Sequence, residues 1–320
     1  MKVAVLDDYQ DVVRKLECFS ELADHEVTVF TTPPQSQDEL VERLKPFEAL
    51  VLIRERTIID NELLAQLPNL KLISQTGKIS NHLDLDACTA HGVSVAEGRG
   101  SPVAPAELCW ALIMASSRHI VPYAENFQQN RWQHSGPLGL GRALNGLTLG
   151  IWGYGKIGQR IAQYGKAFGM NILVWGREPS REKAVSDGFQ AAESKQEFFA
   201  NADVLSLHLR LNDATRACVT ADDLAQMKRD ALIVNTSRAE LIESGALLAA
   251  LEAKRPGFAA LDVFENEPAY LSNEPLLGLP NVLATPHLGY VEQGGYELYF
   301  SIAFDNVVKF AEGKPENLAN

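Results

Sequence analysis

One segment in the middle of the chain constrains the fold more than any other: residues 147–162 read LTLGIWGYGKIGQRIA. An apolar run ends at Trp152, the pattern G-x-G-x-x-G follows, and apolar residues then recur at helical spacing. In such a strand–turn–helix unit the first glycine permits the tight turn, the second lets backbone amides approach a pyrophosphate, and the third lets the helix pack on the strand. The segment predicts a parallel α/β domain that binds a dinucleotide; an ordinary glycine-rich turn is the alternative.

Short β-branched runs alternate with helical stretches on both sides of this segment, which is typical of parallel α/β architecture. The N-terminal part predicts strands at Val3–Leu6, Glu26–Phe30, Ala49–Ile53, Lys71–Ser74 and Val93–Val95, with helices at Asp38–Leu44 and Asn61–Leu67. A second series predicts strands at Thr148–Trp152, Ile172–Trp175, Val204–Leu207, Ala231–Asn235, Gly257–Asp262 and Val282–Ala284. This second series has the size of a complete doubly wound dinucleotide-binding domain.

A long helical stretch joins the two series, from Pro102 to about Asn130. Pro102 and Pro105 fit its first turn, where a missing N–H group costs nothing. Pro122 lies well inside the stretch and predicts either a kink or two consecutive helices.

The length of 320 residues suits two domains rather than one. We expect a first domain over residues 1–100 and a dinucleotide-binding domain over residues 101–287. In the remaining segment, 288–320, a helix over Gln293–Ala311 is expected to return to the first domain.

Composition and charge exclude several classes of protein. The formal net charge of −12 argues against a nucleic-acid partner or an anionic membrane surface. The longest apolar run, Leu108–Ala115, is eight residues, far short of the ~20 that span a bilayer. The four cysteines are far apart and form no Cys-x-x-Cys pair, which predicts no metal site and a cytoplasmic location.

The end of the second predicted strand of this domain bears on the choice of cofactor. An acidic residue about 20 positions beyond the glycines normally binds the ribose 2′-hydroxyl of NAD. Gly176 stands at that place and Arg177 follows it. No carboxylate repels a 2′-phosphate there, and a guanidinium can pair with one. The pattern favours NADP over NAD, with Arg177 as a solvated turn residue as the alternative.

Among the seven histidines, His287 is the candidate acid–base group. It follows Pro286 at the carboxyl end of the last predicted strand, the sheet edge where doubly wound domains place their ligands. His208 also follows a strand, and we expect it to line the cofactor cleft.

Two further strand ends carry polar side chains, Arg238 in N-T-S-R and Glu267 in D-V-F-E-N-E-P. An arginine, a carboxylate and a histidine at one sheet edge suit hydride transfer to a 2-oxo acid. Arg238 would hold the substrate carboxylate, His287 would donate a proton to the carbonyl oxygen, and Glu267 would orient the imidazole. Each residue taken alone could equally belong to a surface ion pair.

Four ordered motifs, namely the glycine turn, N-T-S-R, L-D-V-F-E-N-E-P and T-P-H-L-G, resemble the D-isomer-specific 2-hydroxyacid dehydrogenases. This family includes phosphoglycerate dehydrogenase, glyoxylate/hydroxypyruvate reductase, D-lactate dehydrogenase and formate dehydrogenase. The resemblance implies a doubly wound Rossmann domain inserted in a smaller flavodoxin-like α/β substrate domain. It also implies a homodimer joined through the nucleotide domains, with the helices of residues 102–130 as the contact.

The same resemblance implies roles for individual residues. It makes Arg238 and Glu267 active-site residues and His287 the proton donor. Its implied cofactor contacts are Gly153, Tyr154, Gly155, Lys156, Ile157 and Gly158 in the turn, Thr236 and Ser237 beside the nicotinamide, and Asp262 at the carboxamide. Its implied substrate contacts are Thr76, Gly77 and Lys78, whose loop grips the carboxylate, and Arg54, which matches a basic position of the phosphoglycerate enzymes.

The resemblance therefore predicts an NAD(P)-dependent D-2-hydroxyacid dehydrogenase acting on an acid of the 3-phosphoglycerate, glyoxylate or hydroxypyruvate type. One alternative is a non-catalytic dinucleotide-sensing protein of the corepressor type. The other is a formate dehydrogenase-like enzyme, although that family typically has glutamine where Glu267 stands.

Overall fold

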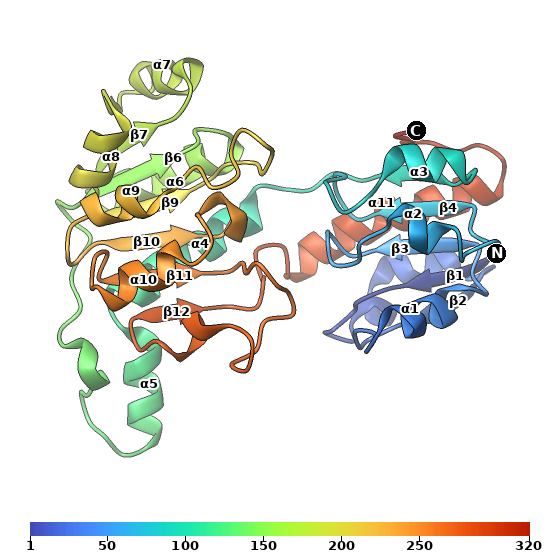
Figure 1. Cartoon of the computed structure of the whole chain (residues 1–320), viewed down its shortest axis with the longest axis horizontal. Coiled ribbons are helices and arrows are strands. Elements are labelled where there is room, and N and C mark those ends of the chain that lie inside the picture. The colour runs from blue at the N-terminus through green and yellow to red at the C-terminus, as the bar shows by residue number, and fades with distance from the viewer. The chain divides into compact units, whose positions relative to one another are not determined.

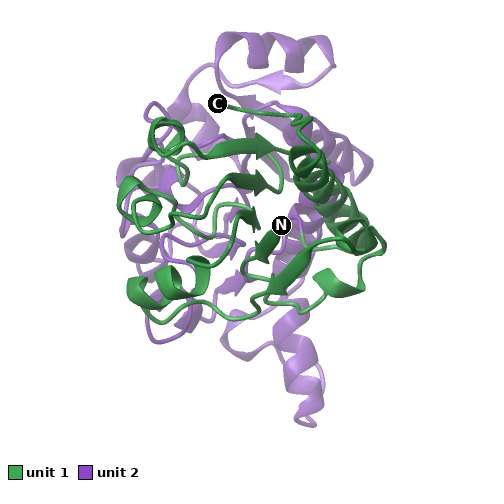
Figure 2. Ribbon diagram, turned by 90° about the vertical axis from the view of Figure 1, so that its right-hand side faces the viewer, with its two compact units in different colours: residues 1–101, 291–320 green, residues 102–290 purple.

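The computed structural model describes all 320 residues and divides them into two compact units. Unit 1 comprises Met1–Ser101 and Val291–Asn320, and unit 2 comprises Pro102–Tyr290 (Figure 2). Each unit is built on one parallel sheet with helices beside it (Figure 1).

Unit 1 contains a five-stranded parallel sheet in the order β2-β1-β3-β4-β5. This is the flavodoxin-like strand order. The strands are β1 (Lys2–Val5), β2 (Glu26–Val29), β3 (Ala49–Leu52), β4 (Leu72–Gln75) and β5 (Ser94–Glu97). The helices are α1 (Gln37–Leu44), α2 (Asn61–Leu64), α3 (Leu85–Ala90) and α11 (Gln293–Ala311), with 3₁₀ turns η1 (Val13–Lys15) and η2 (Glu17–Leu22).

The C-terminal helix α11 closes unit 1. It packs beside β4, where the hydroxyl of Ser74 donates to the carbonyl of Ala303 at 2.8 Å. The strands β3 and β4 are buried along their whole length, as expected for parallel strands covered on both faces.

Unit 2 contains a seven-stranded parallel sheet in the order β12-β11-β10-β9-β6-β7-β8. Numbered within the unit, this is the 3-2-1-4-5-6 order of doubly wound dinucleotide-binding sheets with one added edge strand. The strands are β6 (Thr148–Trp152), β7 (Asn171–Trp175), β8 (Gln190–Ala191), β9 (Val204–Leu207), β10 (Leu232–Asn235), β11 (Phe258–Leu261) and β12 (Val282–Ala284). The expected α/β class is confirmed. Six of these strands are predicted from sequence, and the two-residue β8 is not.

The helices of unit 2 cover its sheet. They are α4 (Val103–Ser117), α5 (Ile120–Gln128), α6 (Lys156–Ala167), α7 (Glu178–Ser186), α8 (Lys195–Asn201), α9 (Ala221–Gln226) and α10 (Ala246–Glu252). Short 3₁₀ turns are η3 (Gly136–Leu138), η4 (Ala239–Leu241) and η5 (Pro275–Gly278). No helix of the chain combines the length and the apolar character that crossing a membrane requires.

Two consecutive helices, α4 and α5, occupy the long helical stretch, which confirms one of the two expected outcomes. The break falls at His119, which adopts a left-handed backbone with φ of 51°, and not at Pro122. Pro122 instead lies in the first turn of α5, where its missing N–H has no helical partner to lose. Figure 1 shows α5 extending away from the body of unit 2.

Candidate active site

The glycine-rich turn between β6 and α6 forms a cradle with one open side. A Cβ atom at Gly153, where φ is +100°, would lie 2.4 Å from the carbonyl oxygen of His208, and one at Gly158 would lie 2.1 Å from that of Gly153. Both positions therefore require glycine. A Cβ at Gly155 would meet nothing within 4 Å.

The N-terminus of α6 faces this cradle. Gly155 is its N-cap residue and no side chain caps the helix. The first N–H groups, beginning at Lys156 and Ile157, have no intrahelical partner and are available to an anion. The turn therefore fits the pyrophosphate of a dinucleotide.

Two arginines follow β7, one at the N-cap of α7 and one within that helix. Gly176 has a φ of +152°, and Arg177 follows as the exposed N-cap residue of α7 without bonding to the helix end. One turn later, the guanidinium of Arg181 lies over the ring of Trp175 at 5.2 Å from the ring centroid. Sequence reasoning missed Arg181, although its spacing of four residues from Arg177 on a predicted helix is a usable signal.

His208 stands at the end of β9, as expected for a residue of the cofactor cleft. Its Nε2 is joined by a 2.9 Å hydrogen bond to the hydroxyl of Ser206, which in turn lies 3.3 Å from the sulfur of Cys109. Burial lowers the pKa of His208 to about 4, so the imidazole is neutral at physiological pH.

His287 and Glu267 meet in the loops after β12 and β11. Nδ1 of His287 donates to Oε2 of Glu267 at 2.7 Å, and Oε1 of the same carboxylate accepts the N–H of Phe264 at 3.0 Å. The ring of Tyr290 lies edge-on to the imidazole, with centroids 5.7 Å apart. The backbone of His287 is itself left-handed, with φ of 54°, so a strained turn aims the side chain.

The pKa of Glu267 lies below its ordinary value. Burial opposes ionisation, but the hydrogen bond and charge of His287, the N–H of Phe264 and the charge of Arg238 outweigh it. The carboxylate is therefore charged at neutral pH and can hold a protonated imidazole.

The turn after β10 presents Arg238. The buried side chain of Asn235 holds this turn, because its Nδ2 donates to the carbonyl of Arg238 at 2.8 Å and its Oδ1 accepts the N–H of Ser237 at 3.1 Å. The hydroxyl of Ser237 donates to the carbonyl of Leu207 at 2.7 Å, which ties the turn to β9.

Asp262, at the end of β11, holds the segment that carries His287. Its Oδ1 accepts the hydroxyl of Thr285 at 2.6 Å and the N–H of Leu288 at 2.7 Å, and its Oδ2 accepts the N–H of Gly289 at 2.9 Å. Burial raises the pKa of this carboxyl despite those hydrogen bonds. The contacts within the chain thus give Asp262 a positioning role that sequence reasoning did not anticipate.

The expected substrate residues of unit 1 lie after β3 and β4. The hydroxyl of Thr76 accepts the N–H of Arg54 at 3.0 Å, and a Cβ at Gly77 would lie 2.2 Å from Nη1 of Arg54. The guanidinium of Arg54 lies over the ring of Tyr299 of α11, 5.6 Å from the centroid. Tyr299 was missed, because nothing in the local sequence places α11 against this loop.

Lys78 stands apart from that group. Its ammonium forms an ion pair with Glu97, which stands at the end of β5. The ammonium of Lys78 is thus paired with a carboxylate of the same unit, and its role as a substrate contact stays a prediction.

Comparisons with known proteins agree with this geometry. Residues 110–289 match the model of the D-isomer specific 2-hydroxyacid dehydrogenase NAD-binding domain. The chain is 36% identical to a glyoxylate reductase of Aeropyrum pernix over 95% of this chain and 92% of that protein. It is 32% identical to a D-3-phosphoglycerate dehydrogenase of Methanocaldococcus jannaschii over 100% of this chain and 59% of that protein.

A solved structure is similar throughout. A phosphoglycerate oxidoreductase from Vibrio cholerae matches with a TM-score of 0.96 and 65% identity, covering 98% of this chain and 99% of that one. The chain belongs to the D-isomer specific 2-hydroxyacid dehydrogenase family. It is an oxidoreductase that acts on a CH–OH group with a nicotinamide cofactor, and the dehydrogenase interpretation is supported over the corepressor and formate dehydrogenase alternatives.

Proposed function

We propose that this protein interconverts a small anionic 2-oxo acid and its D-2-hydroxy acid, with Arg238, Glu267 and His287 as its active-site residues. The observation that carries the proposal is the 2.7 Å hydrogen bond between His287 and Glu267 at the carboxyl edge of a dinucleotide-binding sheet. A charged carboxylate behind an imidazole is the arrangement that a proton donor at neutral pH needs.

The roles follow from the chemistry of each group. When bound, the reduced nicotinamide supplies a hydride to the carbonyl carbon of the substrate. Arg238 binds the substrate carboxylate with its planar guanidinium. His287 delivers a proton from Nε2 to the carbonyl oxygen, and the charged carboxylate of Glu267 keeps the ring oriented.

The residues of unit 1 support a substrate with a second anionic group. Gly77 provides a backbone amide just after β4, whereas the N–H of Thr76 donates to the carbonyl of Leu52 at 3.0 Å; the guanidinium of Arg54 lies beside this loop over the ring of Tyr299. Arg54 adopts a left-handed backbone with φ of 55°, a strained conformation of the kind found at functional sites. A 2-oxo acid of the phosphohydroxypyruvate type carries such a second charge.

The cofactor that the chain favours is NADP. Residues Gly153–Gly158 would hold the pyrophosphate, and Thr236, Ser237 and His208 line the strand ends beyond it. At the ribose, Gly176 leaves no carboxylate to repel a 2′-phosphate, whereas Arg177 and Arg181 offer two guanidinium groups.

We further propose a homodimer built on unit 2 and a cytoplasmic location. No side chain of α5 is buried in the single chain, and near its end the ring of Phe127 meets that of Trp132 edge-to-face while the two are 61% and 75% exposed. A second copy covering this arm would bury them. Analytical ultracentrifugation tests the dimer, and a monomer at micromolar concentration contradicts it.

A panel assay tests the reaction. Glyoxylate, hydroxypyruvate, 3-phosphohydroxypyruvate and pyruvate are each combined with NADPH and NADH, and loss of the reduced cofactor is followed by absorbance. We expect turnover with NADPH to exceed that with NADH, and 3-phosphohydroxypyruvate to show a lower KM than pyruvate. The absence of turnover with every pair contradicts the proposal.

A further inference from the structure

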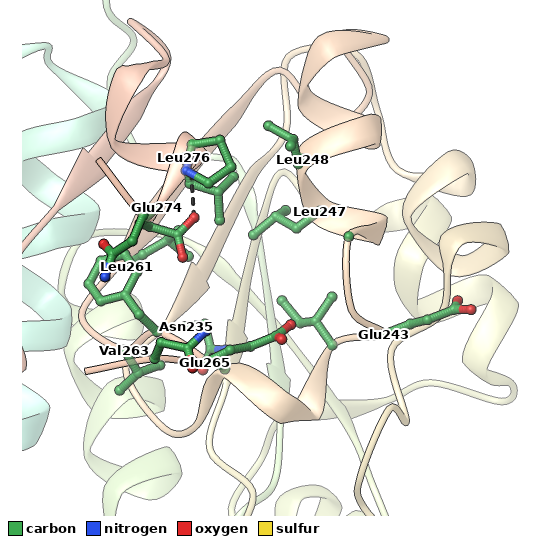
Figure 3. Close-up of a pocket in the computed structure, with 16 residues that line it drawn as sticks. Asn235, Glu243, Leu247, Leu248, Leu261, Val263, Glu265, Glu274 and Leu276 are labelled. Atoms are coloured by element: carbon green, nitrogen blue, oxygen red, sulfur yellow. Dashed lines mark hydrogen bonds between the residues drawn. The ribbon is translucent and has the colours of Figure 1, made fainter. Parts of the chain in front are cut away.

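A cavity of about 230 Å³ lies in unit 2 between helix α10 and the segment that runs from Val263 to Leu276 (Figure 3). Its apolar lining comes from the two sides and from the sheet: Ile242, Leu247, Leu248, Leu261, Phe264 and Leu276. The volume is slightly below the range of about 300–1,000 Å³ typical of drug-sized ligands, so the cavity suits a small molecule. Neither the glycine turn nor His287 contributes to it.

All the ionisable side chains that line this cavity are acidic, namely Glu243, Glu265 and Glu274. Figure 3 shows Glu265 and Glu274 extending toward the space beside Leu247, whereas Glu243 points away from it. In each of Glu265 and Glu274, one carboxylate oxygen already accepts a hydrogen bond. Oε2 of Glu265 accepts the hydroxyl of Ser244, and Oε1 of Glu274 accepts the N–H of Leu276, both at 3.1 Å.

The other oxygens, Oε1 of Glu265 and Oε2 of Glu274, make no hydrogen bond or ion pair within the chain. Two carboxylate oxygens that no group of the chain pairs with therefore border an apolar floor; Glu265 is exposed to solvent and Glu274 is half-buried. The complementary ligand is an organic cation, whose ammonium group reaches the carboxylates while its hydrocarbon body covers the leucines.

The walls of the cavity also support the active-site residues. Asn235, which is 1% exposed, lines the cavity and bonds through its amide to both Ser237 and Arg238. Phe264 lines it too, and its N–H donates to Glu267 at 3.0 Å. A molecule in the cavity thus touches the residues that hold both the Arg238 turn and the Glu267 carboxylate.

We propose that this cavity binds a small primary amine with a short branched hydrocarbon body, and that occupancy changes the rate of the reaction through the supports of Arg238 and Glu267. The binding stands independently of the reaction proposed above, whereas the effect on rate rests on it. For the ligand to change the rate, it must bind one arrangement of Asn235 and Phe264 more tightly than another, and the two arrangements must differ in catalytic rate.

Calorimetric titration of the full-length protein with 3-methylbutylamine tests the binding, with 3-methylbutanol as the neutral isostere. We expect the amine to bind at least about tenfold more tightly than the alcohol, because the alcohol cannot pair with the carboxylates. Glu265→Gln should weaken binding of the amine by about three- to tenfold. Glu243→Gln, the matched control whose carboxylate points away, should leave it unchanged. Equal affinity for amine and alcohol, no measurable binding of the amine, or equal loss in both variants overturns the proposal.

A second measurement tests the effect on rate. At a saturating concentration of the amine, kcat for reduction of the best 2-oxo acid should change at least about twofold, since linkage couples binding to the catalytic supports. The same concentration should have no effect on Glu265→Gln. An unchanged kcat in the wild-type protein, with binding seen by calorimetry, overturns the coupling. Because the calorimetry requires no substrate, failure of the proposed reaction leaves the binding result readable.

Discussion

Nδ1 of His287 donates a 2.7 Å hydrogen bond to Oε2 of Glu267. This bond fixes the plane of the imidazole and leaves Nε2 without a hydrogen bond within the chain. The two residues come from loops that follow neighbouring strands, β12 and β11, so the register of the parallel sheet brings them together. If His287 is the proton donor proposed above, this arrangement presents a single nitrogen, Nε2, for the transfer.

If His287 is the proton donor, His287→Gln should slow 2-oxo acid reduction by about 10²–10⁴-fold, because the amide cannot deliver a proton. Affinity for the reduced cofactor, measured by nicotinamide fluorescence, should barely change, since the turn proposed to hold the pyrophosphate, Gly153–Gly158, does not include His287. Turnover close to that of the wild type would mean that another group donates the proton.

Glu267→Gln should change the pH profile rather than abolish activity. The pKa of Glu267 is lowered, so its negative charge is present at neutral pH and is lost only as the pH falls through that lowered value. Glutamine removes the charge that favours the protonated imidazole. The alkaline limb of the reduction rate should therefore move to lower pH by about 1–2 units, with a smaller loss of rate in acid.

The matched control for this experiment is Glu265→Gln, which neutralises a carboxylate of the same segment that is bonded to Ser244 and not to His287. Its alkaline limb should coincide with that of the wild type. A limb that stays in place in Glu267→Gln, or moves equally in both variants, would contradict the assigned pair.

Local sequence signals were sufficient for most of the sheet and for the contact between His287 and Glu267. Strands of a parallel sheet read as short, mostly apolar runs. Thr148–Trp152, Val204–Leu207 and the partly exposed edge strand Val282–Ala284 have the predicted bounds. Polar residues that follow such runs lie at one edge of the sheet, which is why His287 and Glu267 could be predicted as neighbours.

Contacts between distant segments had no such signal. The sequence predicts that the helix over Gln293–Ala311 returns to the first domain, but it does not show which face of the helix meets which loop, so the approach of Tyr299 to Gly77 was missed. The break between α4 and α5 lies at His119, whose backbone is left-handed. The sequence predicted the break at Pro122 instead, because proline is the stronger helix-breaking signal. Strand β8 spans only two residues, too few for any alternation to show.

Two glycines of the nucleotide turn should fail in different ways when replaced by alanine. Gly158→Ala places a methyl group 2.1 Å from the backbone oxygen of Gly153, so the free energy of unfolding should fall by about 1–3 kcal/mol.

At Gly155, by contrast, an added Cβ meets free space and φ has an ordinary value of −84°, so Gly155→Ala should keep the stability of the wild type. Its methyl group nonetheless enters the open side of the cradle, and the Kd for NADPH should rise at least about tenfold. Denaturant titration and cofactor titration separate the two effects, and normal affinity in Gly155→Ala would place the pyrophosphate elsewhere.

Arg177→Asp should shift the cofactor preference from NADPH towards NADH. The substitution removes a guanidinium that can pair with a 2′-phosphate and adds a carboxylate that repels the phosphate but can bind a ribose hydroxyl. The measurement is kcat/KM with each cofactor at a fixed concentration of the same 2-oxo acid, and the NADPH-to-NADH ratio should fall at least about tenfold. Arg160→Asp makes the same change of charge at an exposed position of α6 and should leave the ratio within about twofold, because it keeps the arginine after β7. A wild-type protein that already strongly prefers NADH, or an equal shift in both variants, would show that the arginine after β7 does not select the cofactor.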